Sequence, residues 1–226
     1  MSDIIKYMMT LMFIHGFATG PSIWDGQIKE FLKDFNVTTD SEKITDLDNV
    51  VIVAWSMGGW KAFKLYSEYP QKIKGLVLVS SFAKYLKSDD YPYGINPALL
   101  RKLEKKFMVD YKEGMKYFYR LVFGNADYDY LIDKIPPHKK EDIVLWFERL
   151  KKEDFRAFLP EVKVPTLLIH GDHDQVVPVE ASKYMNTKIV SSELEIFNGG
   201  GHALFIAEID KFNLIARNFI RQFSFP

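Results

Sequence analysis

One short stretch of the sequence, Asn49–Phe63, constrains the fold more than any other. It reads NVVIVAWSMGGWKAF, so an apolar, mostly β-branched run leads into Ser56, two glycines and a helix-like sequence. A strand that turns this sharply into a helix strains the turn residue and tolerates only small residues around it. Ala54 and Gly58, two positions before and after Ser56, meet that requirement. We predict a strand–turn–helix unit that projects Ser56 above a sheet; the plain alternative is a serine that caps an ordinary helix.

Short apolar runs bounded by turn residues predict the strands of one parallel sheet. Helix-like segments lie between several of them, and strands that alternate with helices form a parallel sheet covered on both faces. Runs without polar alternation suit strands that are buried on both sides. The fold class is therefore α/β. The predicted strands are Tyr7–Ile14, Val50–Trp55, Leu76–Ser80, Thr166–His170 and Leu194–Phe197, with a weaker strand at Phe35–Thr39.

Residues 82–160 have a different pattern, because they contain no convincing strand. Apolar residues recur there at i, i+3, i+4 and i+7, which is the spacing of amphipathic helices. Gly124 suits the C-terminal end of one of these helices. We predict a helical cap insertion over 82–160 and a core domain made of 1–81 and 161–226. The helical segments are Pro97–Phe107, Tyr111–Phe123 and Lys139–Leu150.

The composition argues against several functions. The 226 residues contain 30 Lys+Arg and 30 Asp+Glu, whereas a nucleic-acid-binding protein needs a basic excess. The absence of cysteine excludes disulfides and thiolate chemistry and fits a reducing compartment. No apolar run approaches the roughly 18 residues that a membrane span needs. We expect a monomeric, cytoplasmic protein with no nucleic-acid or membrane partner.

A serine nucleophile needs a base, and the base needs an acid that orients it. The segment GGGHALF places His202 just after the last predicted strand, and HGDHDQVVP places Asp172 and Asp174 just after the strand before it. Both positions lie at carboxyl ends of strands, where open α/β sheets carry their sites. The order serine, acid, histidine is that of hydrolases with a nucleophile elbow. We predict that Ser56, Asp174 and His202 act together; Asp172, the alternative acid, is expected to bond to loop amides.

Acyl transfer also requires two donors for the developing oxyanion. The backbone N–H of Met57 directly follows the nucleophile, and FIHGFATG turns back over the sheet after a strand, which makes the Phe17 N–H the second donor. His15 is expected to bond to the backbone of its own loop. No group of histidines and acids has convincing metal-ligand spacing, so we predict neither a metal nor a cofactor.

Four motifs together resemble the α/β-hydrolase superfamily along nearly the whole chain: FIHGFATGPSIWD, WSMGGWKAF, PTLLIHGDHDQVVP and GGGHALFIAEIDKF. The similarity is closest to BioH-type pimeloyl-[acyl-carrier protein] methyl ester esterases. The tryptophan of WSMGG and an insertion that begins SSFAKYLKSDDYPYGINPALLRKLEKKF carry that closer likeness. The resemblance implies the α/β-hydrolase fold, in which helices flank a mostly parallel central sheet and a helical cap is inserted.

The resemblance also implies an activity and a set of residues. The activity is that of a carboxylesterase in biotin biosynthesis, which removes the methyl group from a pimeloyl chain carried on acyl-carrier protein. By the motif match, the triad is Ser56, Asp174 and His202, the oxyanion donors are Phe17 and Met57, and the substrate-binding residues are Phe17, Phe118 and Val122. The alternatives are a different hydrolase of this fold, either a general short-chain esterase or a MenH-like enzyme, and a non-catalytic ligand receptor.

Two departures from the family pattern, together with the charge of the insertion, bear on partners and fold. Asp40–Asn49 is shorter than usual, so we expect the helix before the elbow strand to be small or missing. The family's arginine-bearing stretch is acidic here, at Asn125–Tyr130. Residues 81–160 contain 16 Lys/Arg and 13 Asp/Glu, a mildly basic surface that would steer an acidic carrier protein. The candidate carrier contacts are Lys102, Lys105, Lys106, Lys112, Lys116 and Arg120.

Overall fold

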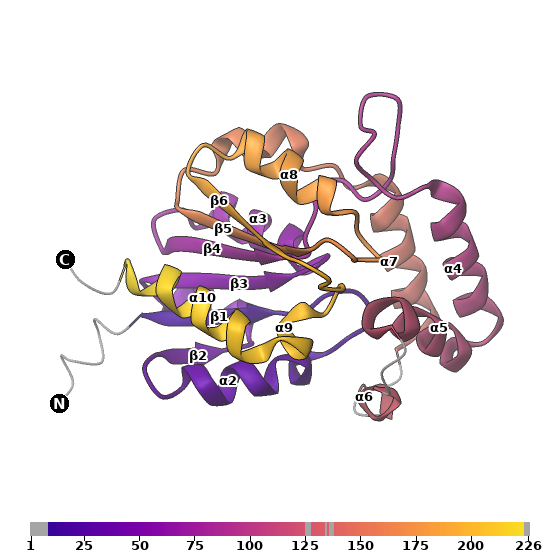
Figure 1. The fold of residues 1–226 in the computed structure, drawn as a ribbon, viewed down its shortest axis with the longest axis horizontal. Helices are drawn as coiled ribbons and strands as arrows, with labels where there is room; N and C mark the ends of the chain where they lie inside the picture. The colour runs from indigo at the N-terminus through magenta and orange to yellow at the C-terminus, as the bar shows by residue number, and fades with distance from the viewer. Residues whose placement is uncertain (1–8, 125–127, 134, 136–137, 224–226) are drawn as a thin grey trace.

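Six parallel strands form the central sheet of the protein, in the order β2-β1-β3-β4-β5-β6 (Figure 1). The structure, a computed structural model, describes residues 9–124, 128–133, 135 and 138–223. The predicted α/β class and parallel sheet are confirmed, and β3 has the predicted bounds. The strands are β1 (Thr10–Ile14), β2 (Asn36–Thr38), β3 (Val50–Trp55), β4 (Ile73–Val79), β5 (Thr166–Gly171) and β6 (Ser192–Phe197).

Strand β4 begins three residues before the predicted start, at Ile73. Lys74 is exposed and Gly75 is a poor strand former, so the pair interrupts the apolar run that marks the strand in the sequence. The structure accommodates Lys74 as the extra residue of a bulge, because Val50 pairs with Ile73 and Val51 with Gly75. A bulge interrupts the apolar pattern of the sequence, so the pattern does not reveal that the strand continues on both sides of it.

The two edge strands are also the ones that the sequence marks least clearly. Strand β6 begins at Ser192 rather than at Leu194, because Glu193 and Glu195 alternate outward along its exposed side. Charged residues on an edge strand protect it from pairing with another chain. At the other edge β2 is three residues long. The predicted first strand included Tyr7 and Met8, which lie outside the described residues.

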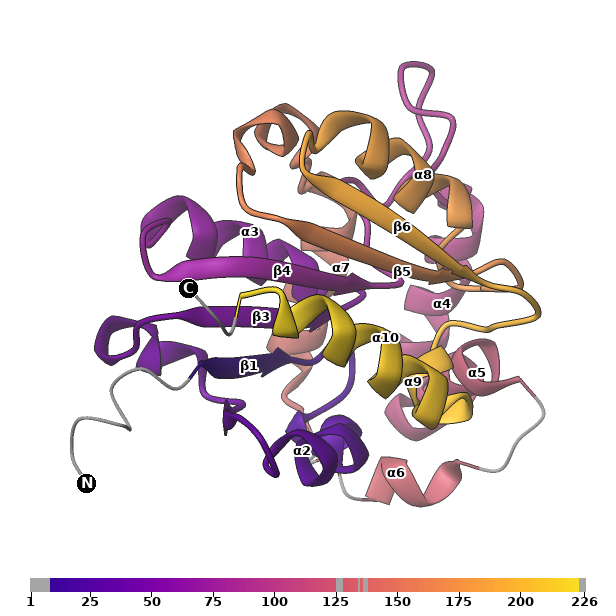
Figure 2. The ribbon, with the colours of Figure 1, turned by 60° about the vertical axis from the view of Figure 1, so that its left-hand side comes forward.

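Helices cover both faces of the sheet (Figures 1 and 2). Helices α2 and α10 pack against one another on one face, and α3 covers the other. The first of these layers is tied to the sheet by aromatic rings: the fully buried Trp24 has its ring centroid 5.2 Å from that of Phe13 on β1 and 4.2 Å from that of Phe205 on α9. The helices are α2 (Asp25–Phe31), α3 (Gly58–Glu68), α8 (Val179–Lys188), α9 (Leu204–Ala207) and α10 (Ile209–Arg221), with η1 (Pro21–Trp24) and η3 (Arg156–Glu161) as short 3₁₀ turns.

The chain between β4 and β5 forms the three predicted helices and the short, unpredicted α6 beyond the carboxyl ends of the strands (Figure 1). Asn96 caps the first of them by accepting a hydrogen bond from the Ala98 N–H at 2.9 Å. Gly124 ends the second with φ +65°, in the left-handed region that favours glycine. The helices are α4 (Pro97–Val109), α5 (Tyr111–Phe123), α6 (Asp129–Asp133) and α7 (Lys140–Lys152).

The two ends of this helical segment lie side by side. The Phe155 N–H donates to the Ala83 carbonyl at 2.8 Å, and Lys84 and Asp154 form an isolated antiparallel bridge. The chain therefore leaves the sheet and returns to it at one place. The division into a core and a cap over 82–160 stays a prediction. Of the acidic stretch Asn125–Tyr130, residues 125–127 lie outside the described part of the chain.

The connection between β2 and β3 is short, as expected from the sequence. It contains the 3₁₀ helix η2 (Ser41–Asp46) and, in this fully described stretch, no α-helix. Asp40 begins η2 by accepting a hydrogen bond from the Glu42 N–H at 3.0 Å. This connection therefore places no α-helix over the carboxyl end of β2. In the described parts of the chain, the structure contains no helix with the length and apolar character that a bilayer span requires.

Gly171 tests how tightly the ends of β5 and β6 are packed. A Cβ atom built on it would overlap the Gly200 carbonyl group and lie 2.8 Å from the Gly201 oxygen. We expect Gly171→Ala to lower the free energy of unfolding by about 1–3 kcal/mol, because backbone atoms cannot move aside cheaply. Urea denaturation measures the change. Gly20→Ala, where a Cβ meets nothing within 4 Å, is the control, and equal midpoints for the two variants would contradict the packing argument.

Candidate active site

Ser56 occupies a strained turn between β3 and α3. Its φ is +55°, a left-handed conformation that a non-glycine residue adopts only when its surroundings impose it. Neighbouring groups hold the residue on both sides: its N–H donates to the Val79 carbonyl at 2.8 Å, and its carbonyl accepts from the Ser81 hydroxyl at 2.9 Å. The strand–turn–helix unit expected at this serine is therefore present.

Two glycines let the loop after β1 pass directly over this turn. A Cβ on Gly58 would lie 2.7 Å from the His15 carbonyl oxygen and 2.9 Å from that of Ile14. A Cβ on Gly16 would lie 3.1 Å from the Ser56 Cβ. Side chains at these positions would push the loop away from the serine. The small residues are thus a condition for bringing the β1 loop and the elbow together.

Asp174 contacts His202, and Asp172 does not. Asp174 Oδ2 accepts a hydrogen bond from His202 Nδ1 at 2.7 Å, and both side chains are fully buried. The other oxygen of Asp174 accepts the N–H groups of Val176 and Val177 at 2.7 and 2.9 Å. Asp172 Oδ1 instead accepts the Gly199 N–H at 2.6 Å. Asp172 therefore joins the two loops through the backbone, while Asp174 orients the imidazole.

His202 lies beside Trp55, the residue that precedes Ser56 in the sequence. Trp55 Nε1 donates to the His202 carbonyl at 3.0 Å, and the two ring centroids are 5.1 Å apart. His202 Nε2 is buried and, among the described residues, has no hydrogen-bond partner. No hydrogen bond joins it to Ser56 in the described structure. The nitrogen opposite the Asp174 contact is thus free to take a proton.

A second imidazole, His170, contacts the same carboxylate. Its Nε2 lies 3.2 Å from Asp174 Oδ2 and 3.0 Å from the Val177 carbonyl oxygen. Both neighbours are acceptors, so Nε2 carries a hydrogen. Its Nδ1 lies 2.7 Å from the Ser182 hydroxyl, which donates to it. Sequence reasoning gave His170 no role, because nothing in its position shows which way the ring turns.

Asp174 carries the negative charge of this site. Burial alone would raise the pKa of Asp174, but the charge of His202 and the hydrogen bonds from His170 and His202 outweigh burial and hold the pKa below its usual range. Burial raises the pKa of the Tyr85 hydroxyl, and the nearby Asp174 raises it further, so Tyr85 stays neutral. Asp174 is therefore a carboxylate stabilised by directed donors.

Phe17 and Met57 each follow a residue of the close contact between the β1 loop and the elbow, Gly16 and Ser56. Neither backbone N–H has a hydrogen-bond acceptor within the residues that the structure describes. The Phe17 ring is buried, with centroids 5.2 to 5.7 Å from those of Phe107, Phe118, Trp146 and Phe147, which fixes its loop. His15 Nδ1 donates to the Gly16 carbonyl at 3.0 Å, and burial lowers the His15 pKa. The N–H groups of Phe17 and Met57, one after β1 and one at the start of α3, are thus unpaired donors of the kind that an oxyanion requires.

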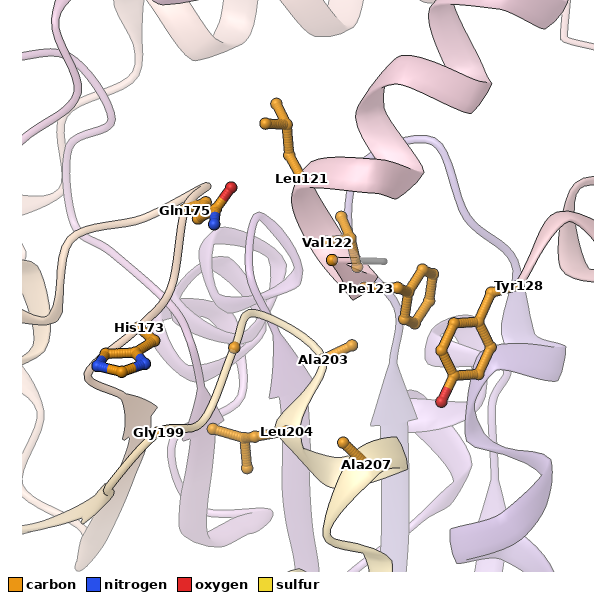
Figure 3. A pocket seen from close by; sticks show the side chains of 12 residues that line it. Leu121, Val122, Phe123, Tyr128, His173, Gln175, Gly199, Ala203, Leu204 and Ala207 are labelled. Atoms are coloured by element: carbon orange, nitrogen blue, oxygen red, sulfur yellow. The ribbon is translucent and has the colours of Figure 1, made fainter. Parts of the chain in front are cut away.

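The predicted substrate residues Phe118 and Val122 line two different cavities. Val122 lines a mainly apolar cavity of about 300 Å³, between the end of α5, α9 and the loop that follows β5 (Figure 3). Phe118 lines a second one of about 70 Å³ between α4 and α5. Gln175, next to Asp174 in sequence, lines both. The two cavities therefore approach the acid loop from the side of the helical segment.

Comparison with known proteins gives one consistent result. Residues 31–208 match the family described as alpha/beta hydrolase fold. Among curated relatives, the pimeloyl-[acyl-carrier protein] methyl ester esterase of Neisseria meningitidis (strain MC58) is 27% identical over 84% of this chain and 77% of its own. The enzyme of that name from Wigglesworthia glossinidia brevipalpis is 28% identical over 96% and 95% of the two chains.

Solved structures agree with the fold. An esterase from Exiguobacterium antarcticum superposes with a TM-score of 0.84 at 22% identity, covering 94% of this chain and 92% of its own. A hydrolase from Oleispira antarctica, olei00960, gives 0.80 at 19% identity over 97% of both chains. At these identities the similarity establishes the arrangement of strands and helices.

The pKa of Asp174 predicts how acid affects stability. A carboxyl group whose pKa is lowered by folding stabilises the protein above its unfolded pKa of about 4, and this contribution is lost as pH falls toward the folded pKa. We expect wild type to exceed Asp174→Asn in free energy of unfolding at pH 7, by an amount that shrinks below about pH 4. Urea denaturation at several pH values measures the difference. A pH-independent gap would contradict the assignment.

Proposed function

Because this chain belongs to the α/β-hydrolase family and is a carboxylic ester hydrolase, we propose that Ser56, His202 and Asp174 form its catalytic triad. One observation carries the proposal: the buried Asp174 holds His202 Nδ1 at 2.7 Å, which leaves Nε2 without a partner in the described chain. Such an imidazole can take a proton from a serine and return it to a leaving group.

The proposed reaction begins when His202 Nε2 removes the proton of the Ser56 hydroxyl as the oxygen attacks the ester carbonyl. The N–H groups of Phe17 and Met57 stabilise the oxyanion, and the alcohol leaves with the proton from His202. Water, deprotonated by His202, then releases the acid from Ser56. Catalytic hydrogen bonds often form only with substrate bound, so the missing Ser56–His202 bond is compatible with this role.

The proposed substrate is the methyl ester of a pimeloyl chain carried on acyl-carrier protein, in biotin biosynthesis. The names of the curated relatives support it. The apolar cavities lined by Phe118 and Val122 suit an aliphatic chain. In this proposal the segment 82–160 is a cap that selects the acyl group, while the sheet carries the chemistry.

The α4–α5 surface is the proposed carrier contact. Lys102 and Lys106 both lie over the ring of Tyr117, at 5.4 and 4.6 Å from its centroid. No carboxylate of the described chain forms an ion pair with Lys102, Lys105 or Lys106. Unneutralised lysines raise the association rate of an acidic partner. This surface also borders the cavity that Phe118 lines.

Removal of the nucleophile tests the triad. We expect Ser56→Ala to lower kcat for p-nitrophenyl esters by at least about 10⁴-fold, because no other group supplies the attacking oxygen. A fluorophosphonate probe should label wild type and Ser67→Ala, an exposed serine of α3, but not Ser56→Ala. Slow or absent labelling of folded wild type would favour a ligand receptor instead.

Growth tests the substrate. The gene should restore biotin-independent growth to a bacterium that lacks its pimeloyl methyl ester esterase, and the Ser56→Ala gene should not. If the purified protein hydrolyses p-nitrophenyl acetate but fails to restore growth, the chain is a general short-chain esterase or a MenH-like enzyme. Mass spectrometry of pimeloyl-[acyl-carrier protein] methyl ester after incubation gives the same answer directly.

A further inference from the structure

A third cavity, of about 250 Å³, is lined in part by the β1 loop and has no assigned role. Its walls come from the end of β1, the short β2–β3 connection, the start of α3 and the helix α7. It shares no lining residue with the two apolar cavities. The short β2–β3 connection leaves this space open, since it brings no α-helix to this edge of the sheet.

The cavity borders the proposed nucleophile. Gly16, Met57 and Gly58 line it. Met57 follows Ser56 in sequence, and a Cβ on Gly16 would touch the Ser56 side chain at 3.1 Å. A group bound in the cavity would therefore lie within a short aliphatic spacer of an ester held at Ser56.

Its lining carries positive charge and no carboxylate. Lys61 and Arg149 line it, and no Asp or Glu does. The carboxylates that compete for these cations are weakly placed: Glu42 is 87% exposed and lies 3.5 Å from Lys61 Nζ, and Glu153 contacts only Nε of Arg149, at 3.3 Å. The two Nη atoms of Arg149 donate no hydrogen bond among the described residues, and its guanidinium lies over the Trp60 ring at 6.0 Å from the centroid. Both cations thus retain capacity for another anion.

Other groups of the lining add donors. Thr39 and Ser41 line the cavity, and their hydroxyls have no hydrogen-bond partner in the described chain. Gly58, the first residue of the eleven-residue helix α3, also lines the cavity, so the positive end of the helix dipole lies at its wall. Two cations, two hydroxyls and the positive end of a helix favour an anion over a neutral ligand.

We propose that this cavity binds a free carboxylate of the substrate, so that half-esters of short dicarboxylic acids are a substrate class of the enzyme. The inference rests on the proposed function, because it requires that the enzyme hydrolyse esters. In that reaction the methyl ester and water give methanol and the acid. The ester lies at Ser56, and the second carboxylate lies between Lys61 and Arg149. A half-ester of this class is hydrolysed free in solution, in addition to the carrier-bound ester of the proposed function.

The test compares charged and neutral esters. The substrates are the monomethyl esters of succinate, glutarate and adipate, each paired with a keto ester in which a methyl ketone replaces the carboxylate. Wild type should give a higher kcat/KM for at least one charged member than for its neutral partner. In the double variant Lys61→Gln/Arg149→Gln that ratio should fall about tenfold, since two partly exposed charge contacts are lost.

Two single variants sharpen the result. Lys29→Gln removes the same charge from an exposed site on α2 outside the cavity, and should leave the ratio unchanged. Glu42→Gln removes the carboxylate that competes for Lys61, and should raise the ratio. If the double variant and Glu42→Gln both have the wild-type ratio, the proposal is wrong, whatever the absolute rates.

Fluorescence separates this proposal from the esterase proposal. Trp146 lines the cavity, whereas Trp24, Trp55 and Trp60 are fully buried. Succinate should change the emission of wild type saturably, succinamide should not, and Lys61→Gln/Arg149→Gln should lose the response. If no ester is hydrolysed but succinate binds in this way, the proposed function fails and the anion site stands. If esters are hydrolysed but succinate gives no saturable change, the anion site fails alone.

Discussion

Close contact between backbones at the carboxyl ends of the strands is the constraint on which the structure depends. The loop after β1 touches the start of α3, where Gly58 leaves room for the His15 carbonyl, and the end of β5 touches the loop after β6, where Gly171 meets Gly200. A residue with a Cβ at either place would separate the segments. Because the glycines permit contact, a serine, an imidazole and a carboxylate from distant parts of the chain gather at one sheet edge.

Most of the fold follows from local pattern, and the exceptions have identifiable physical causes. The apolar run Val50–Trp55 and the amphipathic spacing in α4, α5 and α7 predict those elements almost to the residue. Strand β4 is predicted too short because a bulge places Lys74 within it, and β6 because an edge strand alternates with exposed glutamates. Periodicity detects burial, so it fails where a strand is half-exposed or its register shifts.

The candidate site shows a similar division between what sequence order conveys and what only packing decides. Ser56, Asp174 and His202 could be named from motif order, and the contact of Asp174 with His202 is present. The ring of His170 and its contacts with Asp174 and Ser182 depend on how β5 and α8 pack, which no spacing records. The separation of Phe118 and Val122 into two cavities, and the charged lining of the cavity beside the β1 loop, likewise arise from tertiary structure.

The backbone hydrogen bond between Ala83 and Phe155 has an evolutionary consequence. Because the two ends of the segment between β4 and β5 already meet, the chain between them can lengthen, shorten or be replaced without straining either strand. In the proposed division between a selecting cap and a reacting core, selectivity and reactivity can then diverge at different rates, since mutations accumulate in one part while the other is preserved. A lineage can acquire new specificities by recombination at this junction and retain the same chemical machinery beneath.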